Sequence, residues 1–200
     1  MIKIIVFDFD GVIIDNYELH YQLSTKQIKY LTREEHRKLF EGNIHEERAK
    51  LKSRNTGFDL PTAFQEHKLL AKTPNKIKKL LLNLSQKYIL GIISSALEVG
   101  LNSYIKNNSL TGVFSFVYGK ETHTSKFEKF KLVTNKFNVK NEEIIFVTDT
   151  LGDILEANKV KIRSIAVDFG YHERARLEKG KPFAIISSFD EFESAILKIK

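Results

Sequence analysis

The sequence predicts an α/β fold, a Rossmann-like doubly wound parallel sheet with a small all-helical domain inserted into it. From residue 74 onward, short apolar runs rich in β-branched residues alternate with amphipathic helical stretches. One further apolar run, residues 2–7 (IKIIVF), stands alone near the start. A long block of helical texture separates this first strand from the second, which indicates an insertion.

The expected domains follow from where that block begins and ends. We expect a core domain of residues 1–15 and 74–200 and a helical cap domain of residues 16–73. A chain of 200 residues can bury one good core with a small appendage. The cap block contains the stretches YELHYQLSTKQIKYL, REEHRKLFEG, HEERAKLKSR and PTAFQEHKLLAK, broken near Gly42-Asn43 and Gly57.

The remaining elements alternate between strand and helix, which implies right-handed crossovers and helices on both faces of the sheet. A helix is expected after Pro74. The expected strands are 89–93, 114–118, 143–147, 163–169 and 183–188. The expected helices lie near 97–107, 126–137, 152–159 and 190–199.

Composition excludes several classes of protein. There is no cysteine, so disulfides, thiolate metal sites and thiol nucleophiles are excluded, and this composition fits a cytoplasmic location. We find no signal-peptide core and no membrane span. The net charge is +7, but the lysines are scattered among acids, so we expect a solvated basic surface and not nucleic-acid binding.

Polar residues follow three strands at the edge where ligands bind in open parallel sheets. They are Asp8-Phe9-Asp10-Gly11, Ser94-Ser95, and the run Thr148 to Asp153. Asp8 and Asp10 project to the same side of an extended segment and repel each other unless a cation compensates. A pair of turn or cap aspartates is the structural alternative. A calcium loop is excluded because Val12 and Ile13 stand at its fifth and sixth positions.

The other candidates have structural alternatives of their own. Asp149 and Asp153 are four apart and are expected on one face of a first helical turn, where a metal or Lys126 would relieve their repulsion. Alternatively Asp149 is an N-cap and Asp153 an exposed acid. Ser94 and Ser95 can be helix caps, or can present a hydroxyl and a helix start to a phosphate. Lys126 can be an ordinary solvated residue.

Taken together, these segments resemble the haloacid dehalogenase-like hydrolase superfamily, in its phosphoglycolate phosphatase-like branch. DFDGVIIDNYELH (8–20) resembles the first motif of that family and ILGIISS (89–95) the second. Lys126 in HTSKFEKF matches the third, and IIFVTDTLGD (144–153) resembles the fourth, with Thr148 where the family usually has glycine. Asp10 is intact, as in the phosphatases and phosphomutases of the family, whereas its dehalogenases lack an acid there.

The resemblance implies a magnesium-dependent phosphatase that works through an aspartyl-phosphate on Asp8. Asp10 is then the acid–base residue, and Lys126 steadies the phosphoryl charge. The implied magnesium ligands are the Asp8 carboxylate, the Asp10 backbone carbonyl and Asp149. Asp153 is not a direct ligand in this assignment; it would hold a metal-bound water or Lys126. Phosphate would be bound by Ser94, Ser95, Gly11 and Lys126.

The cap would close over the site and select the leaving group. The cap residues expected to contact substrate are Arg37, Asn43 and His45, and exposed helix residues are their structural alternative. The expected partner is a small phosphorylated metabolite, not a membrane. Three alternatives remain: a phosphomutase with the same motifs, a phosphatase of nucleic-acid ends, and a non-catalytic binding protein, which the intact acids oppose.

Overall fold

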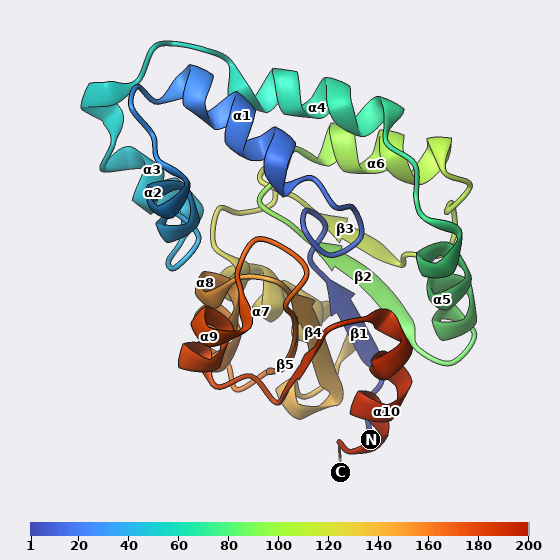
Figure 1. Ribbon diagram of the computed structural model, residues 1–200. Helices are drawn as coiled ribbons and strands as arrows, with labels where there is room; N and C mark the ends of the chain where they lie inside the picture. Colours follow the sequence, from blue (N-terminus) through green and yellow to red (C-terminus); the bar gives the residue numbers. More distant parts are fainter. Residues whose placement is uncertain (200) are drawn as a thin grey trace.

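The computed structural model describes residues 1–199 and has at its centre a six-stranded parallel sheet (Figure 1). The strand order is β3-β2-β1-β4-β5-β6, and every neighbouring pair runs parallel. The strands are β1 (Ile4–Phe7), β2 (Ile89–Ile93), β3 (Phe116–Tyr118), β4 (Ile144–Thr148), β5 (Arg163–Val167) and β6 (Ala184–Ile186). β1 and β4 occupy the middle of the sheet, so their carboxyl ends lie at the centre of one edge.

Helices cover both faces of the sheet because the central strands are apolar on both sides. In β1, Ile5 and Phe7 pack into one core cluster, and Ile4 and Val6 pack into the other. The first face is covered by α5 (Asn75–Ser85), α6 (Glu98–Asn107) and α10 (Phe192–Leu197). The second is covered by α7 (Lys126–Phe137), α8 (Leu151–Lys159) and α9 (Arg174–Leu177). This arrangement confirms the predicted doubly wound α/β fold.

The chain between β1 and α5 is helical and lies beyond the carboxyl edge of the sheet (Figure 1). It contains α1 (Tyr17–Gln27), α2 (Arg33–Lys38), α3 (Ile44–Ala49), the 3-10 turn η1 (Lys52–Arg54) and α4 (Leu60–Leu70). Ile28, Leu31 and Leu39 form a small apolar cluster of their own there. We refer to this segment as the cap. Its exact division from the core, at residues 16 and 73, stays a prediction.

Most elements lie where the sequence predicts them, and the differences are local. The strand expected at 114–118 covers only Phe116–Tyr118. The helix expected at 190–199 is shortened to Phe192–Leu197, because Ser188 caps a 3-10 turn, η4 (Phe189–Glu191), ahead of it. α9 and the short turns η2 (Asn141–Glu143) and η3 (Glu178–Gly180) were not predicted. In the described part of the chain, no helix has both the length and the apolar character needed to cross a membrane.

Candidate active site

A cavity of about 480 Å³ lies between the carboxyl edge of the sheet and the cap helices. Its core side includes Asp8, Asp10, Ser94 and Lys126, which come from the ends of β1 and β2 and from the start of α7. The cap side is contributed by α1, the α2–α3 region and α4, with lining residues His20, Asn43, His45, Arg48, Phe64 and Lys68. The structure therefore brings the acids of the first motif, the serines and the lysine to one enclosed space.

Asp8 and Asp153 share one buried lysine. The Lys126 Nζ lies 2.8 Å from Asp8 Oδ2 and 2.6 Å from Asp153 Oδ2. Asp153 Oδ2 also accepts a 2.6 Å hydrogen bond from the Thr148 hydroxyl, so the residue at the unusual fourth-motif position supports this group. The ammonium thus fixes the Asp8 carboxylate at the cavity floor.

The charges of this trio are set by burial and by each other. Burial raises the pKa of Asp8 well above its usual value, and the nearby Asp153 and Asp149 raise it further, against the opposing effect of Lys126. Burial also acts on Asp153, but Lys126 and the hydrogen bonds to that carboxylate outweigh it and lower its pKa. Lys126 is buried, yet the two carboxylates raise its pKa, so it stays an ammonium.

Asp10 is held by the cap, through a residue that sequence reasoning missed. Lys68 of α4 is 2 % exposed, and its Nζ lies 3.0 Å from Asp10 Oδ1. The same oxygen accepts a 2.7 Å hydrogen bond from the Asn16 side chain. Asp10 Oδ2 has no hydrogen-bond partner among residues 1–199. One carboxylate oxygen therefore orients the group, and the other is left for a proton.

Asp149 lies in a cradle that only glycines permit. A Cβ on Gly11, whose φ is +78°, would lie 1.9 Å from Asp149 Oδ2, and one on Gly170 would lie 2.4 Å from that atom. Asp149 Oδ2 accepts a 2.7 Å hydrogen bond from the Tyr171 amide. The prediction that Asp149 shares a helical turn with Asp153 is wrong: Thr150 is the N-cap of α8, so Asp149 remains in the loop before the helix.

The residues around Asp149 fit a hard divalent cation. Asp149 Oδ1 is buried without a hydrogen-bond partner, and burial raises the pKa of this carboxyl to about 8. A buried carboxylate with a free oxygen, close to a second carboxylate, gains most from a cation. No three Asp, Glu or His side chains converge as metal ligands within residues 1–199. The predicted set, two carboxylates and one backbone carbonyl, needs no third such side chain.

The hydrogen-bond donors predicted to bind phosphate differ in whether they are free to donate. Ser94 is buried, and its hydroxyl accepts a 3.1 Å hydrogen bond from the Ala96 amide, which leaves its proton to donate elsewhere. The Ser95 amide makes no hydrogen bond within the described chain. The Gly11 amide instead donates to the Ile14 carbonyl at 2.8 Å, so this backbone donor is already used. Gly11 serves the site through the space it leaves for Asp149.

Of the three cap residues predicted to contact substrate, two line the cavity and one does not. Asn43 and His45 line the cavity, and Asn43 Nδ2 also contacts the Thr124 carbonyl at 3.1 Å. Burial, together with Lys120 and Lys129, lowers the pKa of His45 to about 4, so its ring is neutral at ordinary pH. Arg37 does not line the cavity; its guanidinium stacks on the Tyr17 ring, 5.1 Å from the centroid.

Besides Lys68, sequence reasoning missed several residues of the site. Tyr171 comes from the loop after β5 and donates from its hydroxyl to Asn16 at 3.2 Å. Glu156 of α8 accepts from the Ser125 hydroxyl at 2.8 Å and from the Lys126 amide at 3.1 Å, and so fixes the start of α7. No spacing in the sequence links these residues to the motifs. The strand-end position of the loop after β5 was the one available signal for Tyr171.

The family model of the haloacid dehalogenase-like hydrolases matches residues 5–167. This span covers most of the chain, including β4, nearly all of β1, the cap and all four motifs. The chain therefore belongs to the haloacid dehalogenase-like hydrolase family, which confirms the predicted resemblance and the enzyme class. No curated protein matches the sequence.

Solved structures with the same fold align with nearly the whole chain. A haloacid dehalogenase-like hydrolase from Streptococcus pneumoniae is 20% identical, with a TM-score of 0.77 over 98% of both chains. A predicted phosphoglycolate phosphatase from Haemophilus somnus is 18% identical, with a TM-score of 0.72 over 98% of both. CbbY from Rhodobacter sphaeroides, solved with phosphate and, as a mutant, with xylulose-(1,5)bisphosphate, is 16% identical, with a TM-score of 0.77 over 96% of both.

Proposed function

We propose that this hydrolase is a magnesium-dependent phosphatase that cleaves a small phosphomonoester through an aspartyl-phosphate on Asp8. The observation that carries the proposal is the placement of Asp8. It lies on the floor of an enclosed cavity, 2.8 Å from the buried Lys126 ammonium, and close enough to Asp149 for the charge of that carboxylate to raise the pKa of Asp8. A carboxylate held this way is suited to attack phosphorus.

In the first half-reaction, an Asp8 oxygen forms a bond to phosphorus while the bond from phosphorus to the ester oxygen breaks. Lys126, the Ser94 hydroxyl and the Ser95 amide would stabilise charge on the phosphoryl oxygens. Asp10 supplies the proton that the leaving oxygen needs. Its Oδ1 is fixed by Lys68 and Asn16, so the proton would be carried on Oδ2.

In the second half-reaction, water attacks the phosphorus of the aspartyl-phosphate, and the bond to Asp8 breaks. Asp10 takes the proton from that water, which restores the acid for the next turnover. Because one residue gives and then receives the same proton, its orientation matters in both steps. The contacts of Lys68, in α4, and of Asn16, at the start of α1, hold that orientation.

Magnesium would be held by the carboxylates of Asp8 and Asp149 and by the backbone carbonyl of Asp10. When bound, it supplies positive charge that screens the anionic phosphate from the anionic nucleophile. The unpartnered Asp149 Oδ1 and the raised pKa values of Asp8 and Asp149 support this choice. Both carboxyl groups are expected to ionise fully only when such a cation is present.

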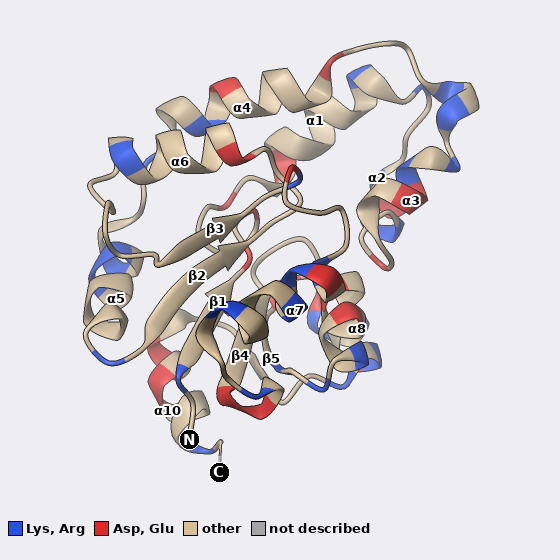
Figure 2. Ribbon diagram, turned by 180° about the vertical axis from the view of Figure 1, so that it is seen from behind, with Lys and Arg blue, Asp and Glu red and all other residues tan. Residues whose placement is uncertain are grey.

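The substrate is proposed to be compact and to carry a second anionic group. A cavity of about 480 Å³ under the cap suits a small ester better than a folded phosphoprotein or a nucleic-acid end. Basic and acidic positions are interspersed along the helices, which also gives no support to a nucleic-acid surface (Figure 2). Arg48 and Lys120 line the cavity and can bind a second anion, as the bisphosphate ligand of CbbY would require of its own site.

The proposal is tested by phosphate release from an aryl phosphate and from a panel of phosphorylated metabolites, with and without magnesium. We expect release only with magnesium or a similar hard cation, and the highest rates on small esters with a second anionic group. Full activity in excess chelator would contradict the metal site. Transfer of phosphate to an added sugar phosphate, in place of release to water, would indicate the phosphomutase.

A further inference from the structure

A second lysine is buried beneath the proposed phosphate site, one helical turn after Lys126. Lys129 of α7 is fully buried, at 0 % exposure. Its Nζ donates a 2.6 Å hydrogen bond to the backbone carbonyl of Ser94. This is the one hydrogen bond of its ammonium within residues 1–199, and Lys129 does not line the cavity. A buried ammonium is costly, so a single carbonyl partner calls for an explanation.

The Ser94 carbonyl belongs to the same peptide group as the Ser95 N–H. That N–H has no partner in the described chain, and Ser95 lines the cavity. A charged donor on the carbonyl side polarises a peptide and strengthens its N–H as a donor. Lys129 therefore acts on the Ser95 amide through one peptide, from behind the cavity wall.

We propose that Lys129 is a positioning residue for phosphate, which fixes and polarises the Ser94–Ser95 peptide so that the Ser95 amide binds a phosphoryl oxygen. This role rests on the proposed function and adds a component to it. Lys126 lines the cavity, whereas Lys129 lies behind the Ser94–Ser95 peptide and acts on the cavity through it. Two ammonium groups one turn apart repel each other, and an anion bound at Ser95 would relieve that repulsion.

The surroundings of Lys129 leave its charge sensitive to pH. Burial, and then the charge of Lys126, lowers the pKa of Lys129 to about 8, against the opposing carboxylates of Asp8, Asp153 and Glu156. Two further groups interact electrostatically with Lys129: Glu98, at the start of α6, and His45 of the cap. As the pH rises through about 8, Lys129 loses its proton and its effect on the peptide. Phosphate affinity should then fall, although Lys126 keeps its charge.

The alternative is that Lys129 only fills space under β2 and contributes to stability. A purely structural lysine would lower the melting temperature when replaced and would leave the phosphate affinity of the folded protein unchanged. The two roles are therefore separated by affinity, not by stability.

The test is calorimetric titration of inorganic phosphate in the presence of magnesium, from pH 7.5 to 9.5, with melting temperatures measured alongside. Lys129→Met removes the charge and the donor, and Lys129→Gln keeps a neutral donor. Lys131→Met is the matched control, because Lys131 lies on the same helix, is exposed, and contacts Glu128 at 3.0 Å and the Phe127 ring, away from the phosphate site. We expect about tenfold weaker phosphate binding for Lys129→Met at pH 7.5, as for loss of a hydrogen bond to a charged group. Lys129→Gln should be intermediate, and Lys131→Met should match the wild type.

The pH series is the decisive readout, because in the wild type it tests the charge of Lys129 without any substitution. Wild-type affinity should fall between pH 7.5 and 9.5, and the affinity of Lys129→Gln should not. A wild-type affinity that stays constant over this range would overturn the role of Lys129, as would a folded Lys129→Met with wild-type affinity. Absence of phosphate binding to the wild type would instead overturn the proposed function itself.

Discussion

The two sides of the cavity are built in different ways. On the core side, the buried Lys126 fixes the carboxylates of Asp8, at the end of the central strand β1, and of Asp153, in the first turn of α8. On the cap side, the lining residues come from several separate helices and loops, and contacts with aromatic rings, histidines and backbone atoms hold them in place. The core side is thus suited to fixed chemistry, and the cap side to selection of the substrate.

The polar groups of the cap form a directional chain. Arg48 Nη2 lies 3.1 Å from His20 Nε2, and His20 Nδ1 lies 2.9 Å from His36 Nε2. A guanidinium only donates, so His20 accepts at Nε2 and donates from Nδ1. Burial and the charge of Arg48 lower the pKa values of both histidines, to about 3 for His36. Neutral histidines therefore hold Arg48 in place without adding positive charge.

The largest effect is expected from the core side. Asp8→Asn should abolish turnover and phosphoenzyme formation, because an amide is a poor nucleophile. The fold should persist, since asparagine has nearly the same shape and relieves a buried charge. Steady-state phosphate release and acid-quenched labelling with a radioactive substrate measure both losses. A variant that retains the wild-type rate would place the nucleophile elsewhere.

Asp10→Asn should come next, with a loss of about 10²–10⁴-fold, the usual contribution of a general acid–base group. Both half-reactions should slow, because the same residue donates and then accepts the proton. Single-turnover experiments resolve the formation and the hydrolysis of the phosphoenzyme. If both rates remain those of the wild type, Asp10 is not the acid–base residue.

The same comparison explains what the sequence could predict. Asp8, Asp10, Ser94 and Lys126 lie close to strand ends or helix starts, and parallel topology brings such positions to one edge. Lys68 lies in the middle of an amphipathic helix, and its sequence context resembles that of many exposed lysines. Only the way α4 packs over Asp10 makes it part of the site. Topology was predictable, but helix packing was not.

Arg37 and Arg48 show the same limit within the cap. Both are basic residues on short helices, and the sequence favoured Arg37. The side chain of Arg48 points into the cavity and that of Arg37 lies on Tyr17 because of how α2 and α3 sit against α1. Rotation of a short helix by one residue changes which side chain lines the cavity, and composition carries no information on that rotation.

Substitutions at the cap side of the cavity should change selectivity more than chemistry. Arg48→Met should raise KM about tenfold for substrates with a second anionic group, and much less for a plain aryl phosphate, because a charge-assisted contact is lost. Arg37→Met, outside the cavity, is the matched control and should leave the ratio unchanged. Values of kcat/KM for paired substrates measure the effect. An equal loss of kcat/KM on both substrates for Arg48→Met would show that Arg48 does not bind the second anionic group.

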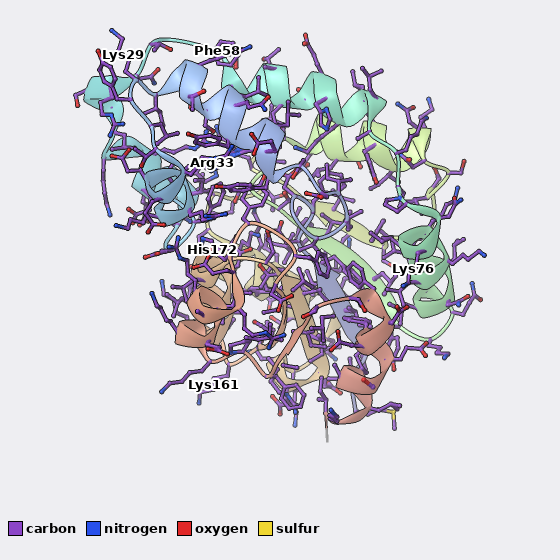
Figure 3. All side chains as sticks on the ribbon, in the orientation of Figure 1. Lys29, Arg33, Phe58, Lys76, Lys161 and His172 are labelled. Carbon is purple, nitrogen blue, oxygen red and sulfur yellow. The ribbon has the colours of Figure 1, made fainter. Side chains whose placement is uncertain are left out.

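The smallest predicted effect lies where the cap docks on the core, away from the cavity. His172 lies at this junction, and its Nε2 lies 2.9 Å from the Arg37 carbonyl (Figure 3). The Gly152 amide donates to the Phe40 carbonyl at 2.8 Å. Arg176 of α9 makes a two-pronged contact with Glu34 of α2, at 2.9 and 3.0 Å. Contacts between backbone atoms and side chains thus join α2 to α8 and α9.

Arg176→Met tests whether this docking matters for catalysis. Arg176 is buried, but Glu34 is largely exposed and water weakens the pair, so we expect a rise in KM of several-fold at most. The value of kcat should change less, because the variant weakens closure of the cap without touching Asp8 or Asp10. Arg174→Met is the matched control, since Arg174 pairs with Asp168 inside the core at 2.8 Å. Added salt should raise KM of both proteins, because it screens the anionic substrate, and should raise that of the wild type more, because it also weakens the Arg176–Glu34 pair. If Arg174→Met and Arg176→Met behave alike, the ion pair serves core stability and not cap closure, and the cap is then held by its other contacts, such as Lys68 with Asp10 and His172 with the Arg37 carbonyl.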